Sequence, residues 1–206
     1  YPNLLTREAA MSLEYVKWSN RVTAEHNVHL AFTRMLAGPM DYTPGGFFNV
    51  PAATFVPRFL NPQVPTTRAH QTALYVVFES AFMMLADFPG AYKDQPETPF
   101  IAKVPVAWDE TRVLSGDPDH HIVIARRKGH DWYVGGITNT DGRDLKVALD
   151  FLPVGNYSLT TIADAPNAAV EATKTAITRS AATRATVLDL KLAPAGGFAL
   201  HMTPAK

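Results

Sequence analysis

The pattern of hydrophobic and polar residues changes near residue 104. Before that point, long apolar runs alternate with proline-rich stretches, whereas after it short alternating segments follow one another, each closed by Gly, Asn, Asp or Pro. Apolar spacing of about 3.6 residues is typical of helices, and strict alternation is typical of half-buried strands. The chain is therefore predicted to have two parts, residues 1–103 and 104–206, with different secondary structure.

Three helices are predicted in the first part. Thr6 is placed as the N-cap of a helix that runs through Trp18. Residues 28–37 form a second helical segment, which ends at Gly38. Residues 66–80 carry apolar side chains at helical spacing and form the third helix.

The run AFMMLA at residues 81–86 is apolar throughout and ends at Asp87. Such a run is typical of a strand buried on both faces of a parallel sheet. A helix, a buried strand and an acid at the strand's carboxyl end follow one another in this order in a (β/α) barrel. We therefore expect residues 1–103 to contain barrel units.

Eight short strands are predicted in the second part, separated by turn signals at residues 115–118, 128–129, 141–142, 153–156 and 194–197. Strands at this spacing favour an antiparallel β-sandwich. The predicted strands cover residues 104–113, 120–127, 131–138, 144–151, 156–163, 173–179, 185–192 and 197–202.

The stretch FTRMLAGPMDYTPGGF at residues 32–47 places Asp41 between two backbone breaks, Gly38-Pro39 and Pro44-Gly45-Gly46. It begins a proline-rich connection to Thr66 that is too long for a plain loop. The connection is therefore either functional or stabilised by packing. Asp41 itself belongs either to a surface turn or to the rim of a site.

Composition narrows the classes of function. The formal net charge is zero, and basic residues cluster only at Arg126-Arg127-Lys128, so no nucleic-acid partner is expected. The chain has no cysteine, which excludes disulfides, thiolate metal sites and thiol nucleophiles. No apolar run reaches the roughly 18–20 residues of a membrane-spanning helix, so no span is expected.

Glu8 and Glu14 are candidate paired carboxylates, which can act as acid and base, as calcium ligands or as solvated helix acids. Six residues of regular helix leave the two side chains about 120° apart around the axis. A shared site therefore requires an irregular turn near residues 9–12. Spacing alone favours two solvated acids.

Two further clusters have simple structural interpretations. His26 and His29 stand three apart, as in a metal-binding helical turn, but no third ligand follows at motif spacing, which favours an exposed helix entry. His120 and His121 point to opposite faces of a strand. Trp108, flanked by acids, is either a sugar platform or, as the flanking sequence favours, an anchor at a domain interface.

Four stretches of the chain together resemble glycoside hydrolase family 97, the bacterial α-glucosidases and α-galactosidases. They are EAAMSLEYVKWSN (8–20), FTRMLAGPMDYTPGGF (32–47), HQTALYVVFESAFMMLAD (70–87) and VPVAWDETRVLSGDPDHHIVIARRKGHDWYVGGITN (104–139). The likeness covers most of residues 6–152, in the family's order. The first stretch is similar to the family segment EAxRGxExNxW but has Met11-Ser12-Leu13 where the family more often has Arg-Gly and a polar residue.

The resemblance implies a fold and an activity. Residues 1–103 would be the last units of a (β/α)₈ catalytic barrel, and residues 104–206 the C-terminal β-sandwich domain. The enzyme would be an exo-acting, calcium-dependent α-glycosidase, periplasmic or secreted, acting on α-linked oligosaccharides or glycosides. The start at Tyr1 without Met would then lie inside a longer chain.

The resemblance also implies residue roles. Glu14 matches the general acid of the family segment and Glu8 matches a calcium ligand, with Glu14 close to the same ion. Asp41 would lie at the substrate rim. The partner carboxylate and the other calcium ligands would lie upstream of residue 1, so the chain alone would be inactive.

Two alternatives stay open on the sequence. The chain could be a non-catalytic carbohydrate-binding or structural β domain with a helical preface, or an inactive relative that kept the scaffold. An incomplete barrel exposes apolar faces, so we expect the isolated chain to self-associate.

Overall fold

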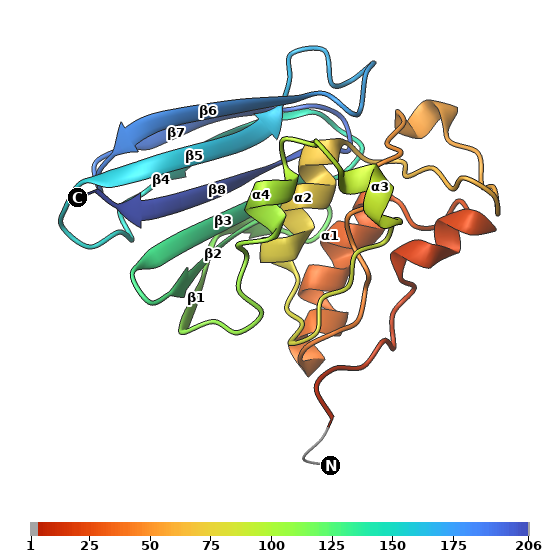
Figure 1. Ribbon diagram of the computed structural model, residues 1–206, viewed down its shortest axis with the longest axis horizontal. Coiled ribbons are helices and arrows are strands. Elements are labelled where there is room, and N and C mark those ends of the chain that lie inside the picture. The colour runs from red at the N-terminus through yellow and green to blue at the C-terminus, as the bar shows by residue number, and fades with distance from the viewer. Residues whose placement is uncertain (1–3, 206) are drawn as a thin grey trace.

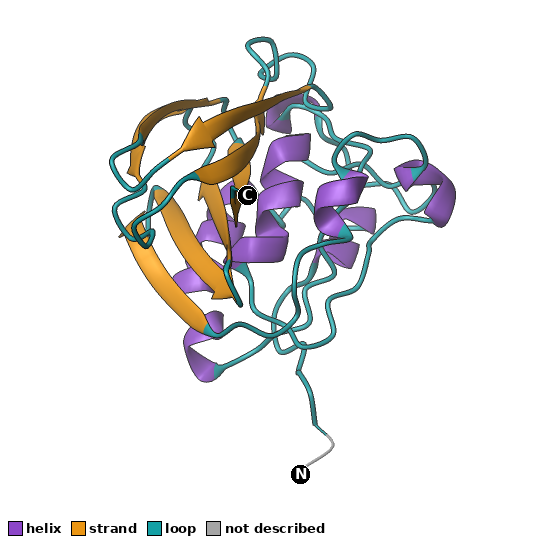
Figure 2. Ribbon diagram, turned by 60° about the vertical axis from the view of Figure 1, so that its left-hand side comes forward, coloured by secondary structure: helices purple, strands orange, loops and turns teal. Residues whose placement is uncertain are grey.

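The computed structural model describes residues 4–205, in which strands gather on one side and helices and long loops on the other (Figure 2). The first part of the chain supplies the helices. They are the 3₁₀ turns η1 (Leu13–Lys17), η2 (Arg34–Ala37) and η3 (Ala52–Thr54), and the α-helices α1 (Ala24–Phe32), α2 (Arg68–Val77), α3 (Pro89–Tyr92) and α4 (Thr98–Ile101).

The second part of the chain supplies eight strands. A six-stranded antiparallel sheet has the order β1-β2-β3-β8-β5-β6, and β4 pairs with β7 in a second sheet. Each of the eight strands overlaps a predicted one, and the β domain is confirmed as mostly antiparallel. Their bounds are β1 (Glu110–Asp117), β2 (His121–Lys128), β3 (Asp131–Thr138), β4 (Arg143–Ala148), β5 (Tyr157–Asp164), β6 (Thr175–Ala182), β7 (Val187–Leu192) and β8 (Gly197–Pro204).

The first strand starts six residues later than its prediction. Residues 104–109 instead form a connection whose Val104 and Trp108 pack against a cluster that contains Tyr133. The ladder begins where Glu110 pairs with Arg127 of β2. Packing of apolar side chains against the sheet therefore replaced strand pairing in this segment.

The central strands of the large sheet are covered on both faces. Along β2, Val123 and Ala125 face the core shared with β4 and β7, while Ile122 and Ile124 face the helices. This two-sided burial explains the consecutive apolar residues at 122–125 of β2 and 132–134 of β3, since neither face meets water there.

Helix α2 lies on the helical side of this sheet, against β3 and β8 (Figure 1). Every residue from Arg68 to Val77 is buried, including four polar side chains. Thr67 caps its start, where the hydroxyl oxygen accepts the N–H of His70 at 3.1 Å. Gly135 of β3 permits the close approach, because a Cβ there would stand 2.7 Å from the carbonyl oxygen of Ala73.

Two of the three predicted helices are confirmed. The helix over 66–80 is confirmed as α2, and the segment over 28–37 is helical in α1 and η2 and ends at Gly38. The helix from Thr6 to Trp18 was wrong, because only η1 forms there. Ala9 adopts a positive φ of 41°, which interrupts any helix, and Arg7 pairs with Met40 instead.

The strand predicted at residues 81–86 was also wrong. The segment has no ladder partner within residues 4–205, and Phe82 stays 60% exposed. A strand of a parallel sheet needs hydrogen-bonding neighbours on its edges. An apolar sequence is therefore not enough to form a strand at this position.

One chain of buried hydrogen bonds crosses the molecule from the first part to the β domain. The Tyr42 hydroxyl donates to Asn27 Oδ1, and the Asn27 amide donates to His70 Nε2 at 3.0 Å. The other ring nitrogen, Nδ1, donates to the carbonyl oxygen of Gly196 at 3.1 Å. These bonds are satisfied together only when the His70 ring is neutral and carries its proton on Nδ1.

This chain predicts a specific dependence of stability on pH. Burial lowers the pKa of His70 from 6.5 to about 4. Above pH 6.5 the ring is neutral in both states; as the pH falls from 6.5 to 4, the unfolded state takes up a proton that the folded state excludes. His70 should therefore reduce the free energy of unfolding by about 1.4 kcal/mol per pH unit in this window.

The measurement compares the wild type with His70→Gln by urea unfolding at several pH values. The variant should be less stable at pH 7 by about 1–3 kcal/mol, and the gap should narrow as the pH falls from 6.5 to 4. His120→Gln, at an exposed position, is the matched control and should track the wild type. A gap that does not change with pH contradicts this account of His70.

Candidate functional site

Three segments of the first part lie side by side in chain order. Arg7 and Met40 form a parallel bridge, and the N–H of Asp41 donates to the carbonyl oxygen of Arg7 at 2.9 Å. On the other side, the N–H of Met40 donates to the carbonyl oxygen of Glu79 at 3.0 Å. This arrangement brings the segment that carries Glu8 next to the segment that carries Asp41.

The segment between Glu8 and Glu14 is irregular. Ala9 has a positive φ, and regular structure resumes only at Leu13, where η1 begins. Both carboxylates are exposed, and the Ser12 hydroxyl donates to Glu8 Oε1 at 3.1 Å. In a regular helix the two side chains would point about 120° apart. Because the segment is not helical, this separation does not apply, and the two carboxylates can share a site.

Arg34 holds the two acid-bearing segments together through their backbones. Its guanidinium donates to the carbonyl oxygens of Arg7 at 2.9 Å and Glu8 at 3.2 Å, and also to those of Gly38 at 3.0 Å and Pro39 at 3.1 Å. A planar guanidinium has five N–H donors in a fixed geometry, which suits this bridging. Sequence reasoning missed Arg34, because its partners are main-chain carbonyl oxygens, and two of them are more than 20 residues away in the chain.

His26 contacts the irregular turn from helix α1. Its Nε2 lies 2.7 Å from the carbonyl oxygen of Met11; because a carbonyl only accepts, the ring nitrogen must donate. The same turn is joined to the Asp41 segment, since the N–H of Leu13 donates to the carbonyl oxygen of Tyr42 at 3.1 Å. Burial lowers the pKa of His26, which favours the neutral ring.

Side chains hold five polar groups of the backbone at residues 44–47, shortly after Asp41. Three of the donors or acceptors come from α2, and two come from the segment before and within α3. The bonds are Tyr75 hydroxyl to Pro44 O (2.9 Å), Gly45 N–H to Gln71 Oε1 (3.0 Å), Tyr92 hydroxyl to Gly45 O (2.9 Å), Phe47 N–H to Asp87 Oδ2 (2.5 Å) and Arg68 Nη2 to Phe47 O (2.5 Å).

The long proline-rich connection is thus stabilised by packing, one of the two expected outcomes. Asp41 precedes the fixed segment, is partly buried and accepts a hydrogen bond from the Thr43 hydroxyl at 3.3 Å. Burial raises the pKa of Asp87, although the Phe47 N–H and the Arg68 guanidinium oppose this shift. Asp87, predicted at a strand end, instead holds the backbone of this segment.

The oxygen donors present suit only part of a calcium site. Calcium takes six to eight oxygen ligands, with carboxylates prominent among them. Glu8 and Glu14 are exposed carboxylates on one turn, but residues 4–205 contain no group of three or more His, Cys, Asp or Glu residues placed to hold a metal. Any calcium held by these two residues needs further ligands from other chain segments.

The remaining candidates have separate structural contacts. His26 bonds to Met11, while His29 lies 3.7 Å from Asp119, so the pair does not chelate one ion. Trp108 packs edge-on against Tyr133, with ring centroids 5.4 Å apart. Trp108 also packs against a cluster that contains Val76 and Phe100 of the first part, as expected of an anchor between the two parts. No helix in the described part of the chain is long and apolar enough to cross a membrane.

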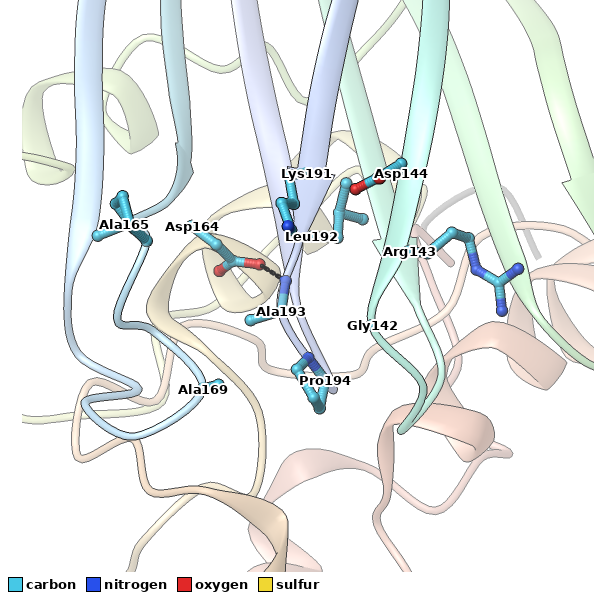
Figure 3. Close-up of a pocket in the computed structure, with 11 residues that line it drawn as sticks. Gly142, Arg143, Asp144, Asp164, Ala165, Ala169, Lys191, Leu192, Ala193 and Pro194 are labelled. Carbon is cyan, nitrogen blue, oxygen red and sulfur yellow. Dashed lines mark hydrogen bonds between the residues drawn. The ribbon is translucent and has the colours of Figure 1, made fainter.

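A cavity of about 470 Å³ lies in the β domain, between the ends of β4, β5 and β7 (Figure 3). Its buried acid is Asp164, whose Oδ2 accepts the N–H groups of Ala193 and Gly197, both at 3.0 Å. Burial raises the pKa of Asp164 to about 6, against hydrogen bonds from Thr67 and the two backbone groups. Asp164 thus fixes the loop that presents Gly196 to His70, and none of the predicted site residues lines this cavity.

Comparison with known proteins gives one family match. Residues 107–203 match the model described as "Glycosyl-hydrolase 97 C-terminal, oligomerisation". A retaining alpha-galactosidase of Bacteroides thetaiotaomicron is 42% identical over 205 residues, which is 98% of this chain and 31% of that protein. A probable retaining alpha-galactosidase of Streptomyces bingchenggensis is 33% identical and covers 82% of this chain and 25% of its own length. The chain thus spans less than a third of these relatives.

Solved structures agree over the whole chain. A glycoside hydrolase family 97 enzyme from Pseudoalteromonas sp. strain K8, in complex with acarbose, superposes with a TM-score of 0.89 at 38% identity. It covers all of this chain, which in turn spans 32% of that enzyme. A variant of the same enzyme in complex with panose gives a TM-score of 0.88.

The fixed segment after Asp41 predicts that Gly45→Ala is destabilising. Gly45 has φ +90°, and a Cβ there would stand 2.3 Å from the Tyr75 hydroxyl oxygen, which is itself held by Pro44. Gly129→Ala is the matched control, since Gly129 has φ +58° with nothing within 4 Å.

Backbone strain alone costs about 1–2 kcal/mol, so the control should lose about that much in urea unfolding. Gly45→Ala should lose about 1–3 kcal/mol more, from the overpacked contact. Equal losses in the two variants would show that the segment yields to the added methyl group.

Proposed function

This chain belongs to glycoside hydrolase family 97, corresponding to the C-terminal part of its members, and on that premise we propose that it completes a calcium-dependent, exo-acting α-glycosidase. The two curated relatives, named as a retaining and a probable retaining alpha-galactosidase, favour an α-galactoside substrate cleaved with retention. The acarbose and panose complexes of the Pseudoalteromonas enzyme support an α-glucoside as the second candidate.

The contacts of the first part support its assignment to the last units of a barrel. Segments at residues 7, 40 and 79 are hydrogen-bonded neighbours in chain order, and the one resolved bridge is parallel. Helix α1 lies between the first pair and α2 between the second. Strand, helix, parallel strand is the repeating unit of a (β/α)₈ barrel, whose catalytic groups stand where strands end.

Exposed aromatic side chains support the same assignment. Trp18, Phe59, Phe82 and Phe88 are all more than half exposed and all belong to residues 1–103. The large apolar side chains exposed in the β domain are valines and one isoleucine. Large exposed aromatic side chains confined to this part of the chain support the proposal that other protein covers it. Preceding segments of the full-length protein would cover it, and the isolated chain would self-associate through it.

The proposed chemistry assigns proton donation to Glu14. Its carboxyl group, in the protonated form, would donate to the glycosidic oxygen as the bond to the anomeric carbon breaks. A carboxylate from a preceding segment would attack the anomeric carbon, as retention requires. Glu14 would then take the proton of the water that releases the sugar, and Asp41 would hydrogen-bond hydroxyl groups at the rim.

Glu8 and Glu14 are the residues of this chain that would hold the calcium ion. When bound, the ion supplies positive charge that stabilises ionised carboxylates and orients oxygen ligands. The Ser12 hydroxyl, bonded to Glu8 Oε1, would fix the direction of that carboxylate. Arg34 would keep the Glu8 backbone in place, because its guanidinium binds the Glu8 carbonyl oxygen and leaves the carboxylate free for the ion.

We also propose a periplasmic or secreted location in a bacterium, supported by the bacterial origin of the relatives. The rival reading, a non-catalytic carbohydrate-binding or structural β domain, is less well supported. The match to the relatives extends over 98% of the chain and includes the acid-bearing segments.

Replacing Glu14 by Gln in the full-length protein tests the assigned acid. Hydrolysis of an unactivated α-galactoside should fall about 10²–10⁴-fold, as expected for loss of a general acid, while the folded state is retained. Activity is measured as initial rates with α-galactoside and α-glucoside substrates, and folding is checked by circular dichroism. Glu171→Gln, an exposed acid of the β domain, is the control.

Near-normal turnover by the Glu14→Gln variant would remove Glu14 from the mechanism. If the wild-type protein itself is inactive, the result would support the alternative that this protein is an inactive member that kept the scaffold.

Replacing Glu8 by Gln should weaken calcium binding by the full-length protein at least about tenfold, since even indirect disturbance of a metal site costs this much. Calorimetric titration with Ca²⁺ measures the affinity, and Asp189→Asn, at an exposed position of β7, is the control. Equal affinities of wild type and Glu8→Gln would contradict the assignment of Glu8 as a ligand.

A further inference from the structure

We infer that His26 is a positioning residue for the acid-bearing turn, setting the backbone from which Glu14 acts. The inference rests on the proposed role of Glu14. It adds a residue from a different element, helix α1, whose side chain makes no hydrogen bond to Glu8 or Glu14 within residues 4–205. The contact that carries it is the hydrogen bond from His26 Nε2 to the carbonyl oxygen of Met11, 2.7 Å long.

The donor stands on a rigid base. His26 lies in the first turn of α1, where the Thr23 hydroxyl oxygen accepts its backbone N–H at 3.2 Å. Neighbouring Ala24, Asn27 and Val28 are buried, and Asn27 belongs to the hydrogen-bonded chain through His70. The backbone of His26 is therefore fixed, and its imidazole extends from helix α1 to the turn at residues 9–13.

Few other hydrogen bonds hold the backbone of the turn, although Leu13 is buried in the core and Ala10 and Met11 pack against it. Within residues 4–205, the His26 bond is the only side-chain hydrogen bond to the backbone of residues 9–13. The main-chain hydrogen bonds lie at the far end of the turn, where the N–H of Leu13 donates to the carbonyl oxygen of Tyr42 at 3.1 Å and the N–H of Tyr15 donates to that of Ser12 at 3.2 Å. Ala9 holds a positive φ near the start, a conformation that a non-glycine residue keeps only when its surroundings impose it.

A loss of this bond should affect proton donation more than folding. The carbonyl of Met11 is three residues from Glu14, so movement there changes where the carboxyl group points. A misplacement of about 1 Å in a catalytic group can cost about 100-fold in rate. Substrates whose leaving group is a strong base depend on the general acid, whereas those with a weakly basic leaving group depart without it.

His29 provides a matched control on the same helix. It lies one turn further along α1, is about half exposed, and its ring contacts only Asp119 at 3.7 Å among charged groups. Replacement of either histidine by Leu removes an imidazole from α1. Only replacement of His26 removes a bond to the turn.

The experiment uses the full-length protein and aryl α-galactosides, or α-glucosides if these are the better substrates, with strongly and weakly basic leaving groups. In His26→Leu, kcat/KM should fall about 100-fold for the strongly basic leaving group and change little for the weakly basic one. His26→Gln keeps an N–H donor of similar reach and should recover most of the rate. His29→Leu should behave as the wild type.

A purely structural role would lower both rates equally, and that result would overturn the inference, as would an unchanged His26→Leu variant. Glu14→Gln in the same series separates the two levels. If the rate loss of Glu14→Gln does not depend on the leaving group, the proposed function fails. If the loss of Glu14→Gln depends on the leaving group and that of His26→Leu does not, only the inference about His26 fails. If His26→Leu does not fold, His26→Gln is compared with His26→Asn, whose amide is too short to reach Met11. Equal dependence of kcat/KM on the leaving group in these two variants would overturn the inference.

Discussion

The buried hydrogen-bonded chain from Tyr42 through Asn27 and His70 to Gly196 is the constraint on which the other features depend. It joins the Asp41 segment, helix α1, helix α2 and the β7–β8 loop, and each donor in it has one acceptor. Buried polar groups are costly unless every member is satisfied, so the chain admits one arrangement of these four elements. Asp164 fixes the loop end of this chain from the opposite side.

That constraint explains how surface acids acquire defined positions. Glu8 and Glu14 are exposed, yet the backbones that carry them are tied to the interior by Arg34, His26 and the Leu13–Tyr42 bond. The side chains stay available while their main chain is held. Sites built this way are positioned by the elements behind them, which is the support that catalytic geometry requires.

Much of the β domain was predictable because its pattern reports directly on local physics. Alternation and turn residues indicated all eight strands, although the first was predicted to start six residues too early. The first part was less predictable, since its acids sit on a turn shaped by distant partners. Neither the partners of Arg34 nor the role of His26 leaves a spacing signal, because both bind main-chain carbonyls that every residue possesses. The segment at residues 81–86 has the sequence of a strand but pairs with no strand within residues 4–205.

The central claim is that preceding segments of the protein complete a barrel whose last units this chain provides. Amide hydrogen exchange at residues 81–86 tests it most directly, with the 206-residue chain and the full-length protein compared under the same conditions. The account predicts fast exchange in the isolated chain and strong protection in the full-length protein, because preceding segments cover residues 81–86 there. Equally fast exchange in both proteins would contradict it.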